Sequence, residues 1–172
     1  MQLPEIKGAF FYHIVLETLF ERGHGAKALE LMRTYWGEML HRGAATWWET
    51  FDPSTPHCTV PSNYQGNTPV YLQDYIPVSL CHGWGASPTY LLIQHVLGIN
   101  VLNLGSKVLH LSPFTKDLNW AKGEIPTRWG TIKVHWWTDT DKSIKYKLEI
   151  PGELQWEGNF DEELIDVEAI TL

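Results

Sequence analysis

The sequence predicts an α+β protein in which the helices come first and the strands follow. Over residues 10–20 and 26–41, apolar residues recur every three or four positions, which is the spacing of one face of an amphipathic helix. Beyond Gly98 the period changes to two, most clearly over residues 144–150. A run of helices followed by a run of strands indicates two structural units, so we expect one domain over residues 1–98 and another over residues 99–172.

Two helices in the first domain form a predicted antiparallel hairpin. The first covers Phe10–Phe20, and Gly23 and Gly25 end it. The second covers residues 26–41, with Gly43 placed as its C-terminal cap. The apolar face of the first helix is expected to consist of Phe11, Ile14, Val15 and Leu19.

A long loop and a third helix complete the helical domain. Residues 52–77 contain five prolines and little periodicity, which predicts a long loop. The third helix begins at Ser87-Pro88, where a serine cap precedes a proline at the first helical position, and it ends at Gly98.

The second domain is predicted to be an antiparallel sheet or β-sandwich. Residues 132–136 and 144–150 both alternate between apolar and polar side chains, and a polar turn joins them, which predicts a hairpin. Acidic residues between Asp161 and Glu168 are expected to form a solvated face. Further short strands are expected at residues 107–112, 118–121 and 154–158.

Composition excludes several classes of function. The chain has 172 residues with a net charge of −7, so no basic stripe is available to bind a nucleic-acid backbone. No apolar run is long enough to cross a membrane and no signal peptide is recognisable, so we expect a soluble, cytoplasmic protein. Cys58 and Cys81 lack the spacing of a zinc or redox motif, and the sequence leaves open whether they pair. No nucleotide, serine hydrolase or zinc protease motif occurs, so no cofactor or metal is expected.

Tryptophan is unusually frequent, with 9 in the chain, and two of these residues precede Glu49 in the run Gly43-Ala44-Ala45-Thr46-Trp47-Trp48-Glu49. Aromatic rings stack on the apolar faces of a pyranose, and a neighbouring carboxylate can activate water at the anomeric carbon. This run therefore indicates a site that acts on sugar.

Three stretches together resemble the C-terminal part of the inverting α-L-rhamnosidases of glycoside hydrolase family 78. They are Tyr35–Leu40 leading into Gly43–Glu49, then Ser79–Pro88 with its Cys81-His82-Gly83-Trp84, and finally Leu97-Gly98-Ile99. Residues 126–134 are similar to the strand pattern of the family's C-terminal β-sandwich. The resemblance implies the last helices and loops of an (α/α)6 barrel, followed by that sandwich.

The resemblance also implies roles for individual residues. Glu49 corresponds to the general base, and His82 to a histidine that touches rhamnose. The indole chemistry adds Trp84 and at most one of Trp47 and Trp48 to the expected sugar contacts, while the other packs, because consecutive side chains point in different directions. The family's general acid lies in an earlier acidic segment, and nothing in residues 1–172 matches that segment.

Simpler interpretations stand beside these roles. Glu49 could face solvent, His82 could be a core residue or a metal ligand, and each tryptophan could be core. Of Trp136 and Trp137, one must point into the sheet core and one outward, where it would suit a carbohydrate or a missing barrel.

The sequence thus supports two functions. One is the C-terminal portion of an α-L-rhamnosidase that hydrolyses terminal α-L-rhamnosides. The other is a non-catalytic carbohydrate-binding or structural module that lacks the acid. In either case the expected ligand is a rhamnose-containing carbohydrate. Either a missing N-terminal barrel or a second copy of the chain is expected to cover the open helical face.

Overall fold

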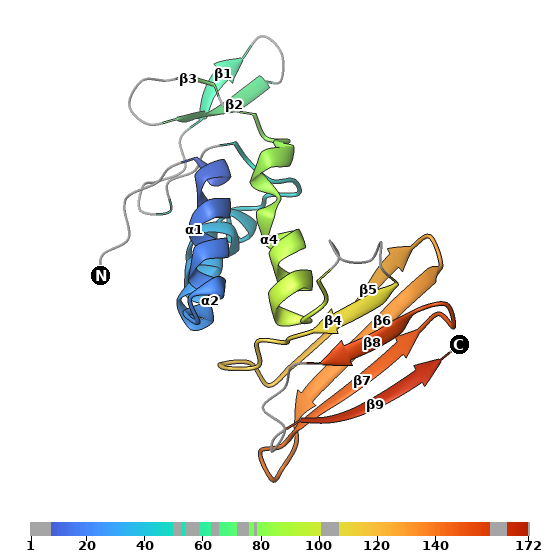
Figure 1. Ribbon diagram of the computed structural model, residues 1–172. Helices are drawn as coiled ribbons and strands as arrows, with labels where there is room; N and C mark the ends of the chain where they lie inside the picture. Colours follow the sequence, from blue (N-terminus) through green and yellow to red (C-terminus); the bar gives the residue numbers. More distant parts are fainter. Residues whose placement is uncertain are drawn as a thin grey trace. The chain divides into compact units, whose positions relative to one another are not determined.

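Figure 1 shows the computed structural model of the chain, which describes residues 8–49, 53, 59–62, 66–71, 76–77, 79–100, 107–158 and 165–171. Its helices and mixed sheets confirm the predicted α+β class. The chain forms two compact units, Met1–Pro88 and Thr89–Leu172. This division precedes the predicted domain boundary at residue 98, because the end of the third helix is bonded to strands of the second unit.

The first unit begins with the predicted helical hairpin. Gly23, with a φ of 74°, turns the chain between the two arms, and Gly43, with a φ of 88°, follows the second arm. The Gly43 N–H donates to the Leu40 carbonyl at 2.9 Å, as expected of a C-terminal cap. The first arm is α1 (Ala9–Glu21), and the second is continuous through α2 (Gly25–Met32), the π-helical turn η1 (Arg33–Gly37) and α3 (Glu38–His41).

An aromatic cluster forms the core of this hairpin. The Tyr12 ring lies 4.6 Å from that of Tyr35 and 5.7 Å from that of Trp36, measured between centroids. Trp36 is buried, and its Nε1–H donates to the Gly85 carbonyl at 2.8 Å. This bond attaches the hairpin to the segment that contains the second sequence motif.

The buried face of α1 differs from the predicted one. Leu19 is buried as expected, but Phe11 is 59% exposed and Ile14 is 55% exposed. The helix is apolar on nearly all sides, so its periodicity is compatible with more than one buried face. The face that packs consists of Ala9, Tyr12, Leu16, Leu19 and Phe20.

The prediction of an unbroken loop over residues 52–77 was wrong. This segment contains a three-stranded antiparallel sheet in the order β1-β2-β3. Pro61 lies opposite Asn67, and Pro69 lies opposite Thr59, two positions further along the β1–β2 ladder. Hydrogen-bonded and non-hydrogen-bonded pairs alternate in an antiparallel ladder, so both prolines can occupy non-hydrogen-bonded pairs, where no N–H is needed. The strands are β1 (Thr59–Ser62), β2 (Gly66–Tyr71) and β3 (Ile76–Pro77).

The predicted third helix is present as α4 (Ser87–Leu91) and the π-helical turn η4 (Leu92–Val96). Two sheets follow in the second unit. One is a four-stranded sheet in the order β5-β6-β7-β9, and the other pairs β4 with β8. The strands are β4 (Val108–Leu111), β5 (Trp120–Thr127), β6 (Gly130–Thr138), β7 (Ile144–Ile150), β8 (Gln155–Gly158) and β9 (Ile165–Thr171).

The end of the helix is bonded to the inner face of the larger sheet. Trp136 is fully buried, and its Nε1–H donates to the Val96 carbonyl at 2.8 Å. The Tyr146 hydroxyl donates to the Leu97 carbonyl at 2.6 Å. A side chain at Gly123 would place its Cβ 2.4 Å from Leu97 Cδ1, so this glycine makes room for the helix end. These contacts satisfy carbonyls that the end of the helix leaves without partners.

The predicted β6–β7 hairpin is confirmed, with strictly alternating burial along β7. Two pairings, however, are parallel, β4 with β8 and β7 with β9, where only antiparallel pairs were expected. The chain leaves the larger sheet through β8 before it returns as β9, which allows β9 to run in the same direction as β7. The expected acidic tail is therefore in part a strand, and its Glu168 lies opposite Lys147.

Two predictions about composition can be compared with the described residues. None of the helices in these ranges is long and apolar enough to cross a membrane. Cys81 is an exposed free thiol, whereas Cys58 and the question of its pairing lie outside the described residues.

Tyr146 makes the stability of the second unit sensitive to alkaline pH. Burial raises its pKa well above the ordinary value, so the folded state holds the phenol protonated. The stabilisation that the protonated Tyr146 gives to the folded state is complete below pH ~10. Above that pH its contribution to the free energy of unfolding falls by about 1.4 kcal/mol per pH unit. We expect the free energy of unfolding to fall less steeply above pH ~10 in Tyr146→Phe than in the wild type. Urea denaturation at several pH values measures both slopes, and equal slopes would contradict the prediction.

Candidate functional site

The two motifs singled out in the sequence lie side by side in the first unit. The Glu49 N–H donates to the Ser79 carbonyl at 2.9 Å, and the His82 N–H donates to the Trp47 carbonyl at 2.8 Å. The Thr46 hydroxyl donates to the Leu80 carbonyl. Backbone pairing therefore brings the candidate base and the candidate sugar-contacting histidine onto adjacent segments.

Glu49 is held on three sides by main-chain groups. In addition to its own N–H bond, its carbonyl accepts from the Ala9 N–H at 3.2 Å, and its Oε2 accepts from the Ser79 N–H at 3.0 Å. The side chain is half-buried. A carboxylate whose direction is fixed in this way is pre-oriented, as a general base must be.

His82 and Trp84 lie on either side of Gly83 in the short 3-10 turn η3 (Gly83–Gly85) and its cap. Their rings are 5.9 Å apart between centroids and meet edge to face. His82 is half-buried, while Trp84 is 68% exposed and lies 5.1 Å from the Phe10 ring. An exposed indole beside an imidazole offers a stacking surface and a hydrogen-bonding group for one sugar.

The structure distinguishes between the two consecutive tryptophans. Trp48 is buried, with 6% of its surface exposed, and its main-chain N–H donates to the sulfur of Met39 at 3.3 Å. Trp47 is half-buried. Trp48 therefore belongs to the core and is unsuited to contact substrate, and Trp47 is the member of the pair that remains a candidate.

Sequence reasoning missed the partners that hold the site together. Ser79 fixes Glu49 at both its N–H and its carboxylate, and Thr46 joins the two motifs through its hydroxyl. Both residues stand inside the motifs quoted from the sequence, but their bonds depend on the pairing of segments 30 residues apart. Among the described residues, no group of three or more His, Cys, Asp or Glu side chains could hold a metal ion.

Two comparisons relate the chain to known proteins. A family model for the C-terminal domain of bacterial α-L-rhamnosidases matches residues 98–157. The crystal structure of the GH78 family rhamnosidase of Bacillus sp. GL1 is similar over 97% of this chain, with 25% sequence identity and a TM-score of 0.73. The chain is related to the C-terminal part of these family 78 rhamnosidases. It spans 16% of the Bacillus protein. No curated protein matches the sequence.

The relationship to rhamnosidases that the motifs predicted is thus confirmed. The family model covers residues of the second unit, whereas the structural similarity extends over nearly the whole chain, including the helical part. The roles of individual residues in the first unit stay predictions, and the geometry of Glu49, His82 and Trp84 is the basis for them.

Gly85 offers a test of how tightly the motifs are packed. A Cβ at Gly85 would lie 3.0 Å from the Trp48 carbonyl oxygen and 3.3 Å from the Ala9 Cβ, whereas a Cβ at Gly83 would meet nothing within 4 Å. We expect Gly85→Ala to lower the free energy of unfolding by about 1–3 kcal/mol through overpacking. Gly83→Ala in the same turn is the matched control and should change it by less than about 0.5 kcal/mol. Urea denaturation measures both, and equal effects would show that the close approach is unimportant.

Proposed function

We propose that this chain supplies the general base and part of the sugar-binding surface of an α-L-rhamnosidase site. The observation that carries the proposal is the bond from the Ser79 N–H to Glu49 Oε2, which fixes the direction of the carboxylate. The segment that contains Glu49 also bonds His82, through the Trp47 carbonyl. The similarity to a rhamnosidase over 97% of the chain supports the choice of sugar.

The proposed chemistry is hydrolysis with inversion. Glu49 removes a proton from a water molecule as that water attacks the anomeric carbon, while a separate acid protonates the departing oxygen. The two carboxyl groups of such a pair stand about 6.5–9.5 Å apart to leave room for the water. Because no segment of residues 1–172 resembles the family's acidic segment, we assign the acid to another region or another chain.

Trp84, Trp47 and His82 would hold the rhamnose. The exposed Trp84 indole suits the apolar face of the ring, and the imidazole of His82 can donate to or accept from a hydroxyl group. The backbone bond between His82 and Trp47 places the three side chains on two joined segments.

A second candidate function is a carbohydrate-binding or structural module without catalysis. The missing acid favours it, since a base alone cannot release an alkoxide leaving group at a useful rate. The two functions differ in one measurable respect, which is whether Glu49 accelerates a reaction that needs no acid.

α-L-Rhamnosyl fluoride provides that reaction, because fluoride departs without protonation. We expect the purified chain to hydrolyse this fluoride and to leave methyl α-L-rhamnoside intact. Glu49→Gln should slow fluoride release at least about 100-fold, the smaller end of what a general base contributes. Release can be followed by fluorine NMR, and proton NMR identifies the anomer formed first. Equal rates in wild type and variant would exclude Glu49 as a base and leave the binding module.

Binding distinguishes the remaining possibilities. Titration with L-rhamnose, followed by the indole signals of a two-dimensional NMR spectrum, should shift the signal of Trp84, and His82→Ala should weaken that response. A response of Trp84 without hydrolysis of the fluoride supports the module, whereas no response at Trp84 leaves only a structural role for the first unit.

We also propose that further helices cover the exposed aromatic patch on α1. The patch consists of Phe10, Phe11 and Ile14, which are all more than a third exposed. The ring centroids of Phe10 and Phe11 are 5.8 Å apart, and Phe10 also contacts Trp84 at the edge of the patch, at 5.1 Å. A helix that is apolar on both sides normally packs on both sides. A preceding barrel region would cover the patch, and in its absence a second copy of the chain would do so.

The patch predicts that the isolated chain self-associates. Phe11→Ser removes the most exposed ring of α1 and should shift the chain toward monomer without lowering its stability. Phe20→Ser on the buried face is the contrasting control and should destabilise the fold by about 3–5 kcal/mol. Analytical ultracentrifugation measures association, and a monomeric wild type that binds no hydrophobic dye would contradict the prediction.

A further inference from the structure

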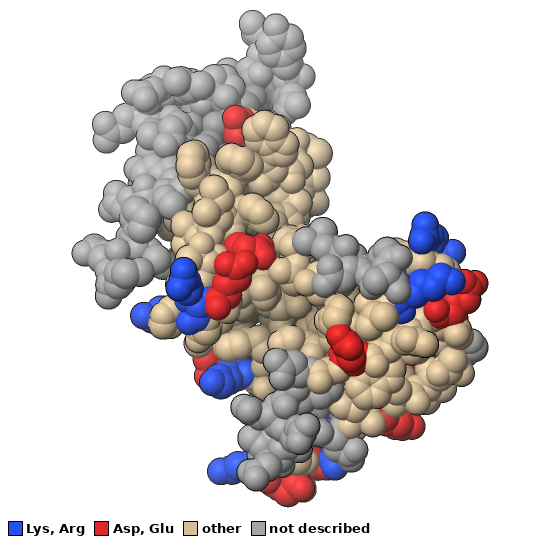
Figure 2. All heavy atoms as spheres, viewed as in Figure 1, with Lys and Arg blue, Asp and Glu red and all other residues tan. Residues whose placement is uncertain are grey.

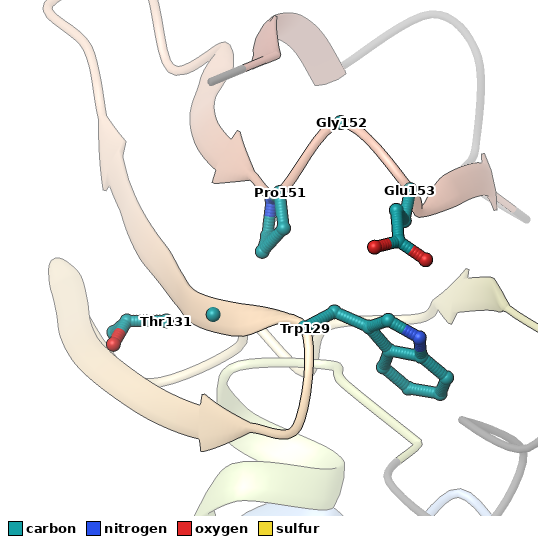
Figure 3. Close-up of a pocket in the computed structure, with 6 residues that line it drawn as sticks. Trp129, Thr131, Pro151, Gly152 and Glu153 are labelled. Carbon is teal, nitrogen blue, oxygen red and sulfur yellow. The ribbon is translucent and has the colours of Figure 1, made fainter.

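A surface pocket in the second unit is not explained by the packing of the sheets. It has a volume of about 430 Å³ and lies between the β5–β6 turn and the turn that follows β7 (Figure 3). Trp129, Gly130 and Thr131 line one side, and Pro151, Gly152 and Glu153 line the other. Its volume lies within the range of small-molecule sites.

The β5–β6 turn is unusual in composition. Arg128 and Trp129 occupy the two positions between the paired residues Thr127 and Gly130, where Asn and Gly are the usual choices. Neither has a positive φ, and Trp129 is only half-buried. Neither turn formation nor core packing therefore accounts for a tryptophan at this position.

The turn is held in a defined conformation. The main-chain N–H of Trp129 donates to Thr127 Oγ1 at 3.1 Å, and the Thr127 hydroxyl donates to the Gly130 carbonyl at 2.7 Å. On the opposite side the Leu154 N–H donates to the Pro151 carbonyl at 2.9 Å. A Cβ at Gly130 would lie 3.0 Å from Pro151 Cγ, so the glycine allows the two turns to approach each other closely.

The charges around the pocket favour a neutral ligand. The Arg128 guanidinium lies 4.2 Å from the centroid of the Trp129 ring, and Lys107 Nζ bonds Glu153 Oε2 at 2.8 Å. Figure 2 shows basic and acidic side chains next to one another where β5 turns into β6. Among the described residues that line the pocket, Glu153 is the charged one, and its carboxylate points toward the Trp129 indole (Figure 3). Because Lys107 pairs with Glu153, a charged ligand would find no unpaired opposite charge among the described lining residues, whereas a hydroxyl group can donate to the Glu153 carboxylate.

We propose that this pocket binds one neutral pyranose unit of a carbohydrate, at a site separate from Glu49. A pyranose presents C–H groups to an apolar surface and hydroxyl groups around its edge. Trp129 and Pro151 provide the apolar surface, and Glu153, which Lys107 bonds, provides a carboxylate acceptor beside it. The pocket would hold a carbohydrate chain on the second unit independently of the chemistry at Glu49.

Two-dimensional NMR of the full chain tests the proposal, since each indole N–H gives its own signal. Trp129→Phe assigns the Trp129 signal. L-Rhamnose and D-glucose are added in separate titrations. With at least one of these sugars we expect the signals of the Trp129 indole and of the Gly130 and Gly152 amides to shift until they saturate, with a dissociation constant in the millimolar range. D-Glucuronate should bind no more tightly than D-glucose, because Lys107 is already paired with Glu153.

Variants separate this site from others on the chain. Trp129→Ala and Glu153→Gln should each weaken the response about tenfold while the remaining amide signals show an intact fold. Trp137→Phe, on the outer face of the same strand pair, should leave it unchanged. No saturable shift with either neutral sugar, tighter binding of glucuronate, or shifts confined to Trp120 and Trp137 would each overturn the proposal.

His82→Ala distinguishes a failure of this proposal from a failure of the proposed function. It should leave the Trp129 response intact while it weakens the Trp84 response. A Trp129 response without a Trp84 response would support the pocket and reject sugar binding at the Glu49 site. The opposite pattern would reject the pocket alone.

Discussion

The pairing of the Glu49 segment with the Ser79 segment is the constraint on which the first unit depends. Ser79 donates to the Glu49 carboxylate and accepts from its N–H, and the neighbouring His82 N–H bonds the Trp47 carbonyl. The same short stretch is tied to the start of α1 through Ala9 and, through Gly85, to Trp36 in the hairpin core. The orientation of the candidate base is thus a property of how the unit folds, because main-chain groups and buried aromatic rings fix it together.

The second unit has its own constraint at the end of the helix. Trp136 and Tyr146 each present one polar atom from the inner face of the sheet to successive carbonyls, at Val96 and Leu97. Large buried aromatic residues with a satisfied polar atom combine apolar packing with a directional bond. They therefore define where the helix ends as well as burying surface, and Gly123 leaves the space that this close approach requires.

Several features of the fold could be predicted because a single local signal determined them. The alternation along β7 was unambiguous, since every second residue is apolar and the intervening ones are charged, and Gly43 was recognisable as a cap. The buried face of α1 could not be predicted, because apolar residues lie around the whole helix and only tertiary contacts select Leu16 over Ile14. The strands near Pro61 were missed because prolines normally argue against strands, and their compatibility depends on a register that no local pattern reveals.

In the candidate site, too, residue types could be predicted from the sequence, whereas the burial of each side chain could not. Glu49, His82 and the tryptophans could be selected by residue type, since carboxylates, imidazoles and indoles carry the chemistry of sugar sites. That Trp48 packs inward while Trp84 is exposed depends on the three-dimensional path of the chain. The pocket beside Trp129 was likewise not predicted, because it forms between two turns that are distant in sequence.

The bond from Ser79 to the Glu49 carboxylate has a consequence for how this site tolerates variation. Because the donor is a main-chain N–H, almost any amino acid at position 79 could provide it, and proline alone lacks the group. The Ser79 side chain has a separate task, since its Oγ accepts from the Cys81 N–H at 3.2 Å. The direction of the carboxylate therefore depends on the peptide group at position 79, whereas the serine side chain supports the turn that follows it.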